Sequence, residues 1–505
     1  MVSHINKIQI PEIATIAKGA GISFFGIISW GALNYSFNVY LARVLKPENF
    51  GLYTIGLAIF NVVGMLSLFG LNSGLIRYVA LYNGVNDKKR TKGTILFSLK
   101  ISILISTSIA AILFFLSKDI SQKLFHKPSL ELVIKYFSLC VPLFVISSVF
   151  LYSIQGFKVM KYMVYSRDLF EPINRFLWVT IFFLVGLRLL GVMFAFLIAL
   201  GLNVLFSYVL LKRIFPISRS PIVPIYESKE LLSFSLPLFF IGLMQIGINR
   251  VDALLLGHFE EAQQVGIYTA AFQTCVLSAI ILRSFNTIFA PIISDLFNRK
   301  KHERLELLYK AVTKWIFTLS LPIFLLILLF TKEILSIFGE KFTLGALCLI
   351  ILSSGQLINS MTGSVGYMLI MIGRSGIAFF NALGVLSLQI VLSLILIPKY
   401  GIVGAAIATA TSWILLNLIR LLEVFIILKI HPFKISFLKP ILAGSVSVAV
   451  LYWLEKSVIT FEHPLLLLVS GSSIFIGIYA MIILLLGLED EDKVVFDKVK
   501  AKLKI

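Results

Sequence analysis

Long apolar runs, separated by short polar connections, restrict the fold of this chain more than any other feature. A run of about 20 apolar residues is long enough to cross the hydrocarbon core of a bilayer as a helix. Only 14% of the 505 residues are charged, against about 25% in soluble domains. The sequence therefore predicts an all-α polytopic membrane protein with about fourteen transmembrane helices. The runs cover approximately residues 19–43, 51–79, 95–117, 132–154, 172–190, 191–211, 231–257, 264–291, 311–331, 345–372, 375–398, 401–428, 436–456 and 464–487.

The basic residues predict the orientation of these helices. Lys and Arg gather in the connections at 88–92, 158–167, 212–229 and 299–310, whereas residues 258–261 in an alternate connection carry none. Loops rich in Lys and Arg stay on the cytoplasmic side of a cell membrane. Both termini are therefore expected in the cytoplasm. The net charge of +20 reflects this topology rather than binding of nucleic acid.

Motifs beside the apolar runs recur once along the chain at a nearly constant distance. Phe50-Gly51-Leu52-Tyr53 before the second run resembles Val265-Gly266-Ile267-Tyr268 before the eighth, 215 residues later. Four such matches in the same order predict two six-helix repeats. Each repeat has an even number of spans, so both insert in the same orientation, as in transporters whose substrate site lies between repeats. The other matches pair Ser117–Ile120 with Thr331–Ile334, Gln155-Gly156 with Ile372-Gly373, and Leu190–Val192 with Tyr400–Ile402.

These repeats and their flanking segments predict a linear organisation. In the tail, Val495, Val499 and Leu503 recur at helical spacing among lysines, which favours either an amphipathic helix on the anionic inner leaflet or a solvated tail. The expected parts are a cytoplasmic segment at 1–18, a first bundle at 19–212, a cytoplasmic linker at 213–230, a second bundle at 231–428, two additional helices at 436–487 and a cytoplasmic tail at 489–505.

Conventional catalysis is not indicated by the sequence. No GxxxxGK[ST] phosphate-binding loop is present, so ATP hydrolysis by this chain is not expected. The six histidines are scattered, and the three cysteines lack the spacing of a metal site. We therefore expect no catalytic residues, no metal ligands and no bound cofactor, and a transporter rather than an enzyme.

The candidate functional residues are polar groups inside the apolar runs. Arg250 and Asp252 stand in run seven after a long uncharged stretch. Charges at this depth are costly, so they are expected to face a cavity or a partner. The alternative is a pair that satisfies itself near the outer interface, with Arg250 reaching toward water. Asp252 is also the candidate for coupling to H⁺ or Na⁺, because it is the best-placed deep carboxylate.

Further candidates extend this polar set. Arg283 lies deep in run eight and Lys100 lies in run three, so buried cations outnumber buried acids. This balance favours an anionic substrate such as a lipid pyrophosphate. Asp168, Glu171 and Arg175 are instead expected in a solvated loop at the entry to run five. The uncharged candidates for substrate binding are Asn38, Asn249, Gln356 and Asn359.

One segment carries a family resemblance. The sequence YLARVLKPENFGLY at 40–53 resembles the opening of polysaccharide-biosynthesis membrane proteins, the O-antigen (Wzx-type) flippases. The stretches at 68–78 and 401–409 are similar to later parts of the same family. The chain has Lys46 where that family usually has Gly. The resemblance covers essentially the whole chain, including the two repeats and the two added helices.

The resemblance implies membership of the multidrug/oligosaccharidyl-lipid/polysaccharide exporter (MATE-like) superfamily. It implies alternating access between two six-helix bundles around a V-shaped cavity. The implied substrate is a polyprenyl-pyrophosphate-linked glycan, moved to the outer leaflet in contact with membrane lipids and with a glycan polymerase or ligase nearby. A lipid II flippase and a cation-coupled multidrug antiporter remain open alternatives. A membrane-embedded glycosyltransferase is a third class, which would need an acidic catalytic pair that the sequence does not show.

Overall fold

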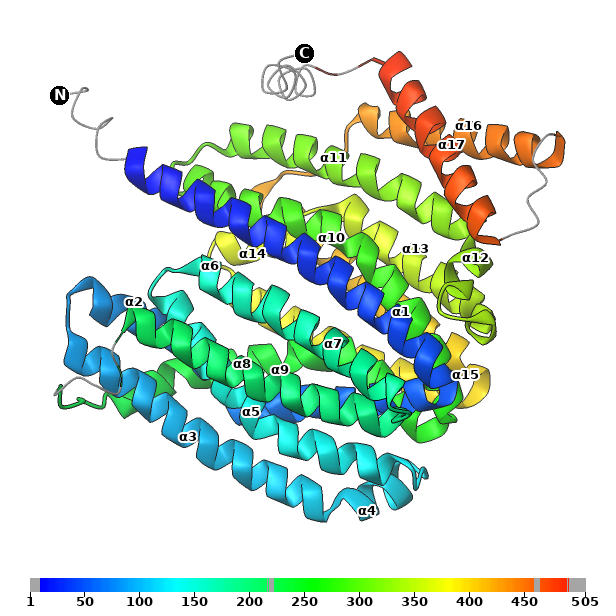
Figure 1. Cartoon of the computed structure of the whole chain (residues 1–505). Coiled ribbons are helices and arrows are strands. Elements are labelled where there is room, and N and C mark those ends of the chain that lie inside the picture. Colours follow the sequence, from blue (N-terminus) through cyan, green and yellow to red (C-terminus); the bar gives the residue numbers. More distant parts are fainter. Residues whose placement is uncertain (1–9, 216, 218–221, 458–463, 488, 490–505) are drawn as a thin grey trace, which may run out of the picture. The chain divides into compact units, whose positions relative to one another are not determined.

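The computed structural model describes residues 10–215, 217, 222–457, 464–487 and 489, and the described elements are helices (Figure 1). They form two compact units, which we describe separately. The first unit comprises residues 1–269 and 382–405, and the second comprises residues 270–381 and 406–505. The predicted tail at 489–505 falls outside the described residues except for Glu489.

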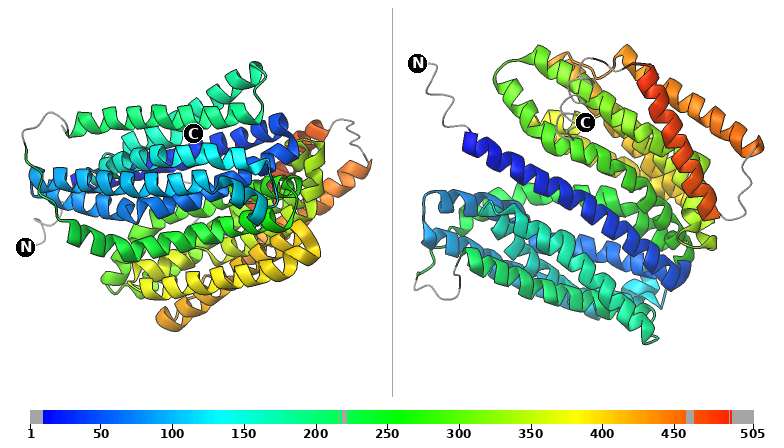
Figure 2. Two further views of the ribbon diagram at one scale, coloured as in Figure 1. Left: turned by 90° about the horizontal axis from the view of Figure 1, so that it is seen from below. Right: turned by 45° about the horizontal axis from the view of Figure 1, so that its top comes forward.

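In the first unit, α5 is the central helix. It packs against α1, α2, α3 and α8, and Figures 1 and 2 show α3, α5 and α8 running alongside one another. Side chains such as Val79, Ile95, Val149 and Leu211 form a buried cluster between these helices. The elements are α1 (Ile10–Leu68), α2 (Leu71–Gly84), α3 (Lys88–Phe115), α4 (Ser117–Asp119), the π-helix η1 (Ile120–Leu124), α5 (Leu130–Gly156), α6 (Met160–Met163), the π-helix η2 (Val164–Phe170), α7 (Glu171–Leu184), α8 (Leu189–Ile214), α9 (Ser228–Phe259), the start of α10 (Ala262–Asn298) and residues 382–405 of α15 (Ser375–Leu428).

The second unit is built around α11 and the helices that pack on it. Its main cluster joins Ile293, Tyr309, Ile316, Met368 and Val424. The elements are the remainder of α10, α11 (His302–Leu329), α12 (Thr331–Ser336), the 3₁₀-helix η3 (Glu340–Gly345), α13 (Ala346–Thr362), α14 (Val365–Met371), the two ends of α15 at 375–381 and 406–428, the 3₁₀-helix η4 (Ile435–Phe437), α16 (Leu438–Ser457) and α17 (Pro464–Leu485).

The chain is a multi-pass membrane protein. Among the described residues, 11 helices are long and apolar enough to cross a membrane. Two of them contain a break: α1 at Lys46 and α15 at Gly401, where runs one and two and runs eleven and twelve were expected to separate. Run five, expected at 172–190, corresponds to the 14-residue α7 and the first residues of α8, and α6 and η2 precede it. The count of fourteen spans stays a prediction.

Two glycines of the repeated motif make reciprocal contacts inside the first unit. A Cβ atom added to Gly51 would overlap the backbone oxygen of Ala262, and one added to Gly266 would overlap the backbone oxygen of Pro47. Pro47 and Ala262 are 215 residues apart, as are the two glycines. A contact in which equivalent positions exchange roles is typical of a two-fold axis. This geometry agrees with the repeat, while the division at 19–212 and 231–428 stays a prediction.

We predict that Gly51→Ala and Gly266→Ala each destabilise the protein by about 1–3 kcal/mol, because the new methyl group meets backbone atoms that side-chain rotation cannot move. Thermal unfolding of the purified protein in detergent measures the change. Gly84→Ala is the matched control, since a Cβ atom there meets nothing within 4 Å. If all three variants unfold at the wild-type temperature, the helix crossing is looser than the structure shows.

The break at Lys46 generates a second prediction. Its φ of 63° and ψ of 168° favour glycine, and strain of this kind costs about 1–3 kcal/mol. We expect Lys46→Gly to raise the unfolding temperature, because it removes the Cβ atom that opposes this conformation. Lys46→Ala keeps the Cβ atom and should give no such gain. An equal rise in both variants would show that the lysine charge, rather than the backbone, causes the strain.

Candidate functional site

Arg250 and Asp252 lie in α9 but do not pair with each other. Asp252 is 2% exposed, and its carboxylate accepts hydrogen bonds from the Tyr268 hydroxyl (2.7 Å) and the Ala253 backbone N–H (2.7 Å). Arg250 forms no hydrogen bond and no ion pair within 4 Å with any described residue. Residues two apart on a helix do not face each other. The Asp252 carboxylate is therefore hydrogen-bonded by Tyr268 of α10 and by the backbone of its own helix. The Arg250 guanidinium has no hydrogen-bond or ion-pair partner among the described residues.

The other candidates in the first unit mostly make local contacts. The Asn38 side-chain amide donates to the Asn34 backbone oxygen (2.8 Å) and side-chain oxygen (2.6 Å). Asn249 donates to the backbone oxygen of Gln245 at 2.6 Å. Both amides are thus bound within their own helices. Lys100 is exposed, and its Nζ lies 3.4 Å from the hydroxyl of Tyr226 in the linker between α8 and α9.

Three predicted residues belong to the second unit. Arg283 is exposed on α10 and has no hydrogen-bonding or ionic side-chain partner among the described residues. Gln356 is 5% exposed, and its side-chain oxygen accepts a hydrogen bond from Asn359 at 3.4 Å. The Nε2 atom of Gln356 is buried without a partner. The structure thus brings Gln356 and Asn359 together and leaves the Arg283 guanidinium uncompensated.

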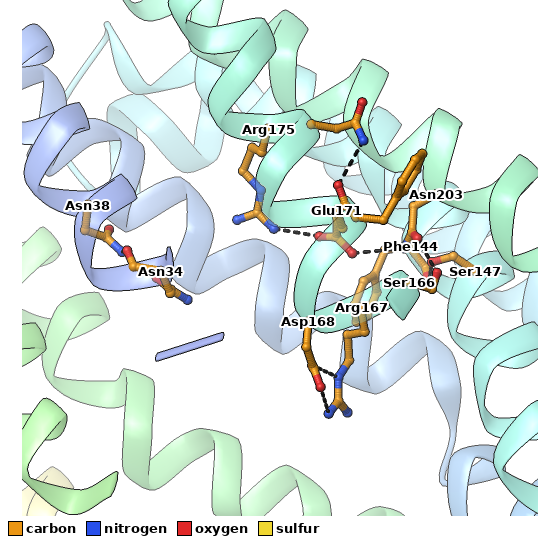
Figure 3. A network of polar contacts seen from close by, with 12 residues as sticks. Asn34, Asn38, Phe144, Ser147, Ser166, Arg167, Asp168, Glu171, Arg175 and Asn203 are labelled. Atoms are coloured by element: carbon orange, nitrogen blue, oxygen red, sulfur yellow. Dashed lines mark hydrogen bonds and ion pairs between the residues drawn. The ribbon is translucent and has the colours of Figure 1, made fainter. Parts of the chain in front are cut away.

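A buried polar network in the first unit, shown in Figure 3, was not expected from the sequence. Arg175 donates to one carboxylate oxygen of Glu171 at 2.6 Å, and the Asn203 amide donates to the other at 3.0 Å. The Ser166 hydroxyl then donates to the Asn203 side-chain oxygen at 2.6 Å. A continuous chain of hydrogen bonds therefore joins η2, α7 and α8.

Aromatic rings and burial surround the Arg175–Glu171 pair. The two side chains are 18% and 14% exposed, and the Arg175 guanidinium carbon lies 4.7 Å from the centre of the Phe196 ring and 5.6 Å from that of Phe37. A buried ion pair is stable only when further interactions offset the loss of water. Here the Asn203 hydrogen bond and the two cation–π contacts supply them. The Arg175 Nε atom nevertheless has no partner.

A second ion pair lies beside this network. The Arg167 Nε atom donates to Asp168 at 2.8 Å, and Asp168 is 4% exposed. A Cβ atom on Gly26 of α1 would lie 2.9 Å from the Asp168 carboxylate. The glycine therefore leaves room for the charged group where α1 passes η2. Both pairs lie where a π-helical segment leads into α7, and such segments are frequent at functional sites.

The expectation that Asp168, Glu171 and Arg175 lie in a solvated loop is wrong. Helical structure begins at Met160, well before the expected start of run five at residue 172. The charged residues had been excluded from the membrane only because they interrupt the apolar pattern. One signal could have identified them: Asn203 stands inside apolar run six, where a buried amide needs hydrogen-bond partners.

The network pairs one acid with one base. A single guanidinium balances the Glu171 carboxylate, so removal of either side chain would leave the other without its ionic partner in a mostly buried setting. No group of three or more His, Cys, Asp or Glu side chains that could hold a metal ion occurs within the part of the chain that the structure describes. The site is therefore described by its ion pairs and amides.

Comparison with known proteins identifies the family. The profile of the polysaccharide biosynthesis protein family matches residues 16–297, more than half of the chain, and the MatE profile matches residues 237–395. A Shigella flexneri protein that carries the name of an O-antigen transporter is 24% identical, with 74% of this chain and 90% of that protein covered. A Haloferax volcanii protein named as a probable low-salt glycan biosynthesis flippase is 29% identical, but only 32% of this chain and 35% of that protein are covered.

Solved structures show the same fold. A structure of the lipid II flippase MurJ superposes with a TM-score of 0.72 at 18% sequence identity, and the match covers 92% of this chain and 98% of that protein. This likeness places the helices in the fold of the multidrug/oligosaccharidyl-lipid/polysaccharide exporter superfamily. Since the family profile extends over more than half of its length, the chain belongs to the polysaccharide biosynthesis protein family.

Proposed function

We propose that this chain is a flippase that moves a polyprenyl-pyrophosphate-linked oligosaccharide across the cell membrane by alternating access. The observation that carries the proposal is the charge left uncompensated in the apolar helices. Arg250 and Arg283 have no hydrogen bond or ion pair from their guanidinium groups to any described residue. The buried carboxylates of Asp252 and Glu171 both accept hydrogen bonds. The free charge is therefore positive, which suits a pyrophosphate.

The orientation belongs to the same proposal. The Lys- and Arg-rich connections, which are every second one along the chain, support an orientation in which these connections and both termini are cytoplasmic. The substrate would then enter from the cytoplasmic leaflet with its polyprenyl tail in the membrane lipids, and leave on the outer side. A glycan polymerase or ligase would accept it there. The transporter relatives support this role over that of an enzyme.

The alternatives make different demands on the same residues. A cation-coupled multidrug antiporter would need uncompensated carboxylates for its cationic substrates, and the described set offers guanidinium groups instead. A lipid II flippase carries the same anionic lipid chemistry. Reconstituted transport of lipid II against that of a polyprenyl-pyrophosphate-linked glycan distinguishes these two substrates.

We also propose that transport is coupled to H⁺ or Na⁺. Asp252 was the candidate from the sequence, and its carboxylate is bound by Tyr268. Glu171 is an additional candidate, because its charge is balanced by one guanidinium in a buried network. A change of its protonation would alter the bonds between η2, α7 and α8.

We predict that the double variant Arg250→Gln, Arg283→Gln reduces glycan export at least about tenfold, since each lost charge-assisted bond contributes about 1.5–3 kcal/mol. Surface glycan in a strain that depends on this gene measures the effect, and membrane protein level is checked in parallel. Arg213→Gln, an exposed residue at the end of α8, should export normally. Normal export by the double variant would contradict a cationic substrate site.

We predict that Glu171→Gln lowers the unfolding temperature, because a buried guanidinium left without its acid costs about 3–5 kcal/mol. The double variant Glu171→Gln, Arg175→Met should regain much of this stability, as a double-mutant cycle would measure. If Glu171 couples transport to protons, the stable double variant should also lose the pH dependence of export. Unchanged pH dependence would remove Glu171 from the coupling mechanism.

A further inference from the structure

Arg420 in α15 of the second unit is half-buried, and its charge has no ion-pair partner among the described residues. Its guanidinium forms no hydrogen bond and no ion pair within 4 Å with the described residues. Its Nε atom is fully buried without a partner. Arginine does not lose its proton in proteins, and an ionised group inside a membrane span needs a partner. The missing partner should therefore be an anion from outside the chain.

The nearest acid on the helix is engaged elsewhere. Glu423 follows Arg420 by three residues, a spacing at which side chains on a helix can pair. Its carboxylate instead accepts a hydrogen bond from the Asn381 amide at 2.6 Å. No ion pair joins Glu423 to Arg420 within 4 Å. The acid lowers the local potential but leaves the guanidinium donors free.

The Arg420 guanidinium lies beside the backbone of Gly366, which has no side chain. A Cβ atom built on Gly366 in α14 would lie 3.0 Å from the Arg420 Nη1 atom. Helix α14 continues from this contact to Met371, and the two residues that follow it line a pocket. The contact with Gly366 thus places Arg420 beside the helix that leads to this pocket.

The pocket has a volume of about 490 Å³ and is lined by Phe297, His302, Ile372, Gly373, Arg374, Ile427 and Leu428. Ile427 follows Arg420 by seven residues, which is two helical turns, so both lie on the same face of α15 about 10 Å apart along its axis. Arg374 and His302 add basic side chains at the pocket. Cavities of about 300–1,000 Å³ hold small ligands.

We infer that Arg420 and the pocket at Arg374 and His302 form a binding site for the phosphate or pyrophosphate group of a lipid. The inference rests on the proposed function, in which a lipid-linked pyrophosphate is the substrate and the connection at 299–310, next to the pocket residues Phe297 and His302, is cytoplasmic. The planar guanidinium binds two phosphate oxygens at once. Arg374 attracts the head group to the pocket and His302 donates a hydrogen bond to it, and the group then moves two helical turns along α15 to Arg420, which lies outside the pocket lining.

Binding of inorganic pyrophosphate and farnesyl pyrophosphate to the full-length protein tests the site. The protein is reconstituted in phosphatidylcholine nanodiscs, and titration calorimetry gives the affinity. We expect Arg420→Met to weaken binding at least tenfold, and Arg420→Lys to weaken it less because a charge remains. Arg213→Met should bind as the wild type does. Wild-type affinity in Arg420→Met would overturn the inference.

The unfolding temperature of Arg420→Met tests whether Arg420 binds a ligand or stabilises the fold. Removing an uncompensated buried charge is neutral or stabilising, so Arg420→Met should unfold at or above the wild-type temperature. A large fall in that temperature would show that the guanidinium holds part of the fold together, and would overturn the site.

Two further arms identify the source of the phosphate. If phosphatidylglycerol in the nanodiscs abolishes pyrophosphate binding, bulk phospholipid occupies the site and the assignment to the substrate fails. If Arg420→Met loses binding but exports glycan normally, the site lies off the transport path and the inference fails. Loss of both pyrophosphate binding and glycan export in Arg420→Met supports the inference. Binding that depends on Arg420 in a protein that exports no glycan would instead overturn the proposed function and leave the site.

Discussion

The structure depends on how charged side chains within the membrane-spanning helices find partners, because water is scarce there. The carboxylates of Asp252, Glu171 and Glu423 each accept a hydrogen bond within the protein. Asp252 takes one from Tyr268, Glu171 from Arg175 and Asn203, and Glu423 from Asn381. The arginines divide into two groups. Arg175 is bound by an acid, whereas Arg250 and Arg420 are not.

The same constraint explains why small residues lie where helices cross. Gly51 and Gly266 allow backbones to approach so closely that main-chain atoms fill the space of a side chain. In a bilayer, close packing replaces the hydrophobic effect between helices. Gly26 and Gly366 use the same absence of a Cβ atom to make room for a charged group, a carboxylate in one case and a guanidinium in the other.

The sequence predicted features that depend on long stretches of residues. The apolar runs indicated the helical membrane fold, and the joints between runs coincide with the breaks at Lys46 and Gly401. The network around Asp168, Glu171 and Arg175 was missed because its charged residues, in η2 and the first turns of α7, interrupt the apolar pattern that defines a run. The surroundings of Asp252 and Arg420 could not be predicted for a different reason: Tyr268 and Gly366 come next to them only through tertiary packing.

The arginines without an acidic partner raise the question of how the protein keeps its own carboxylates away from a proposed anion-binding site. An arginine that a transported anion must reach cannot be bound by a resident acid, because the substrate would then have to displace it at a cost of several kcal/mol. Glu423 shows one solution. It stands three residues from Arg420, yet Asn381 occupies its carboxylate. In the proposed site, this hydrogen bond from Asn381 holds the Glu423 carboxylate and leaves the Arg420 guanidinium available to an anion, so Asn381 would be a positioning residue that touches no substrate itself.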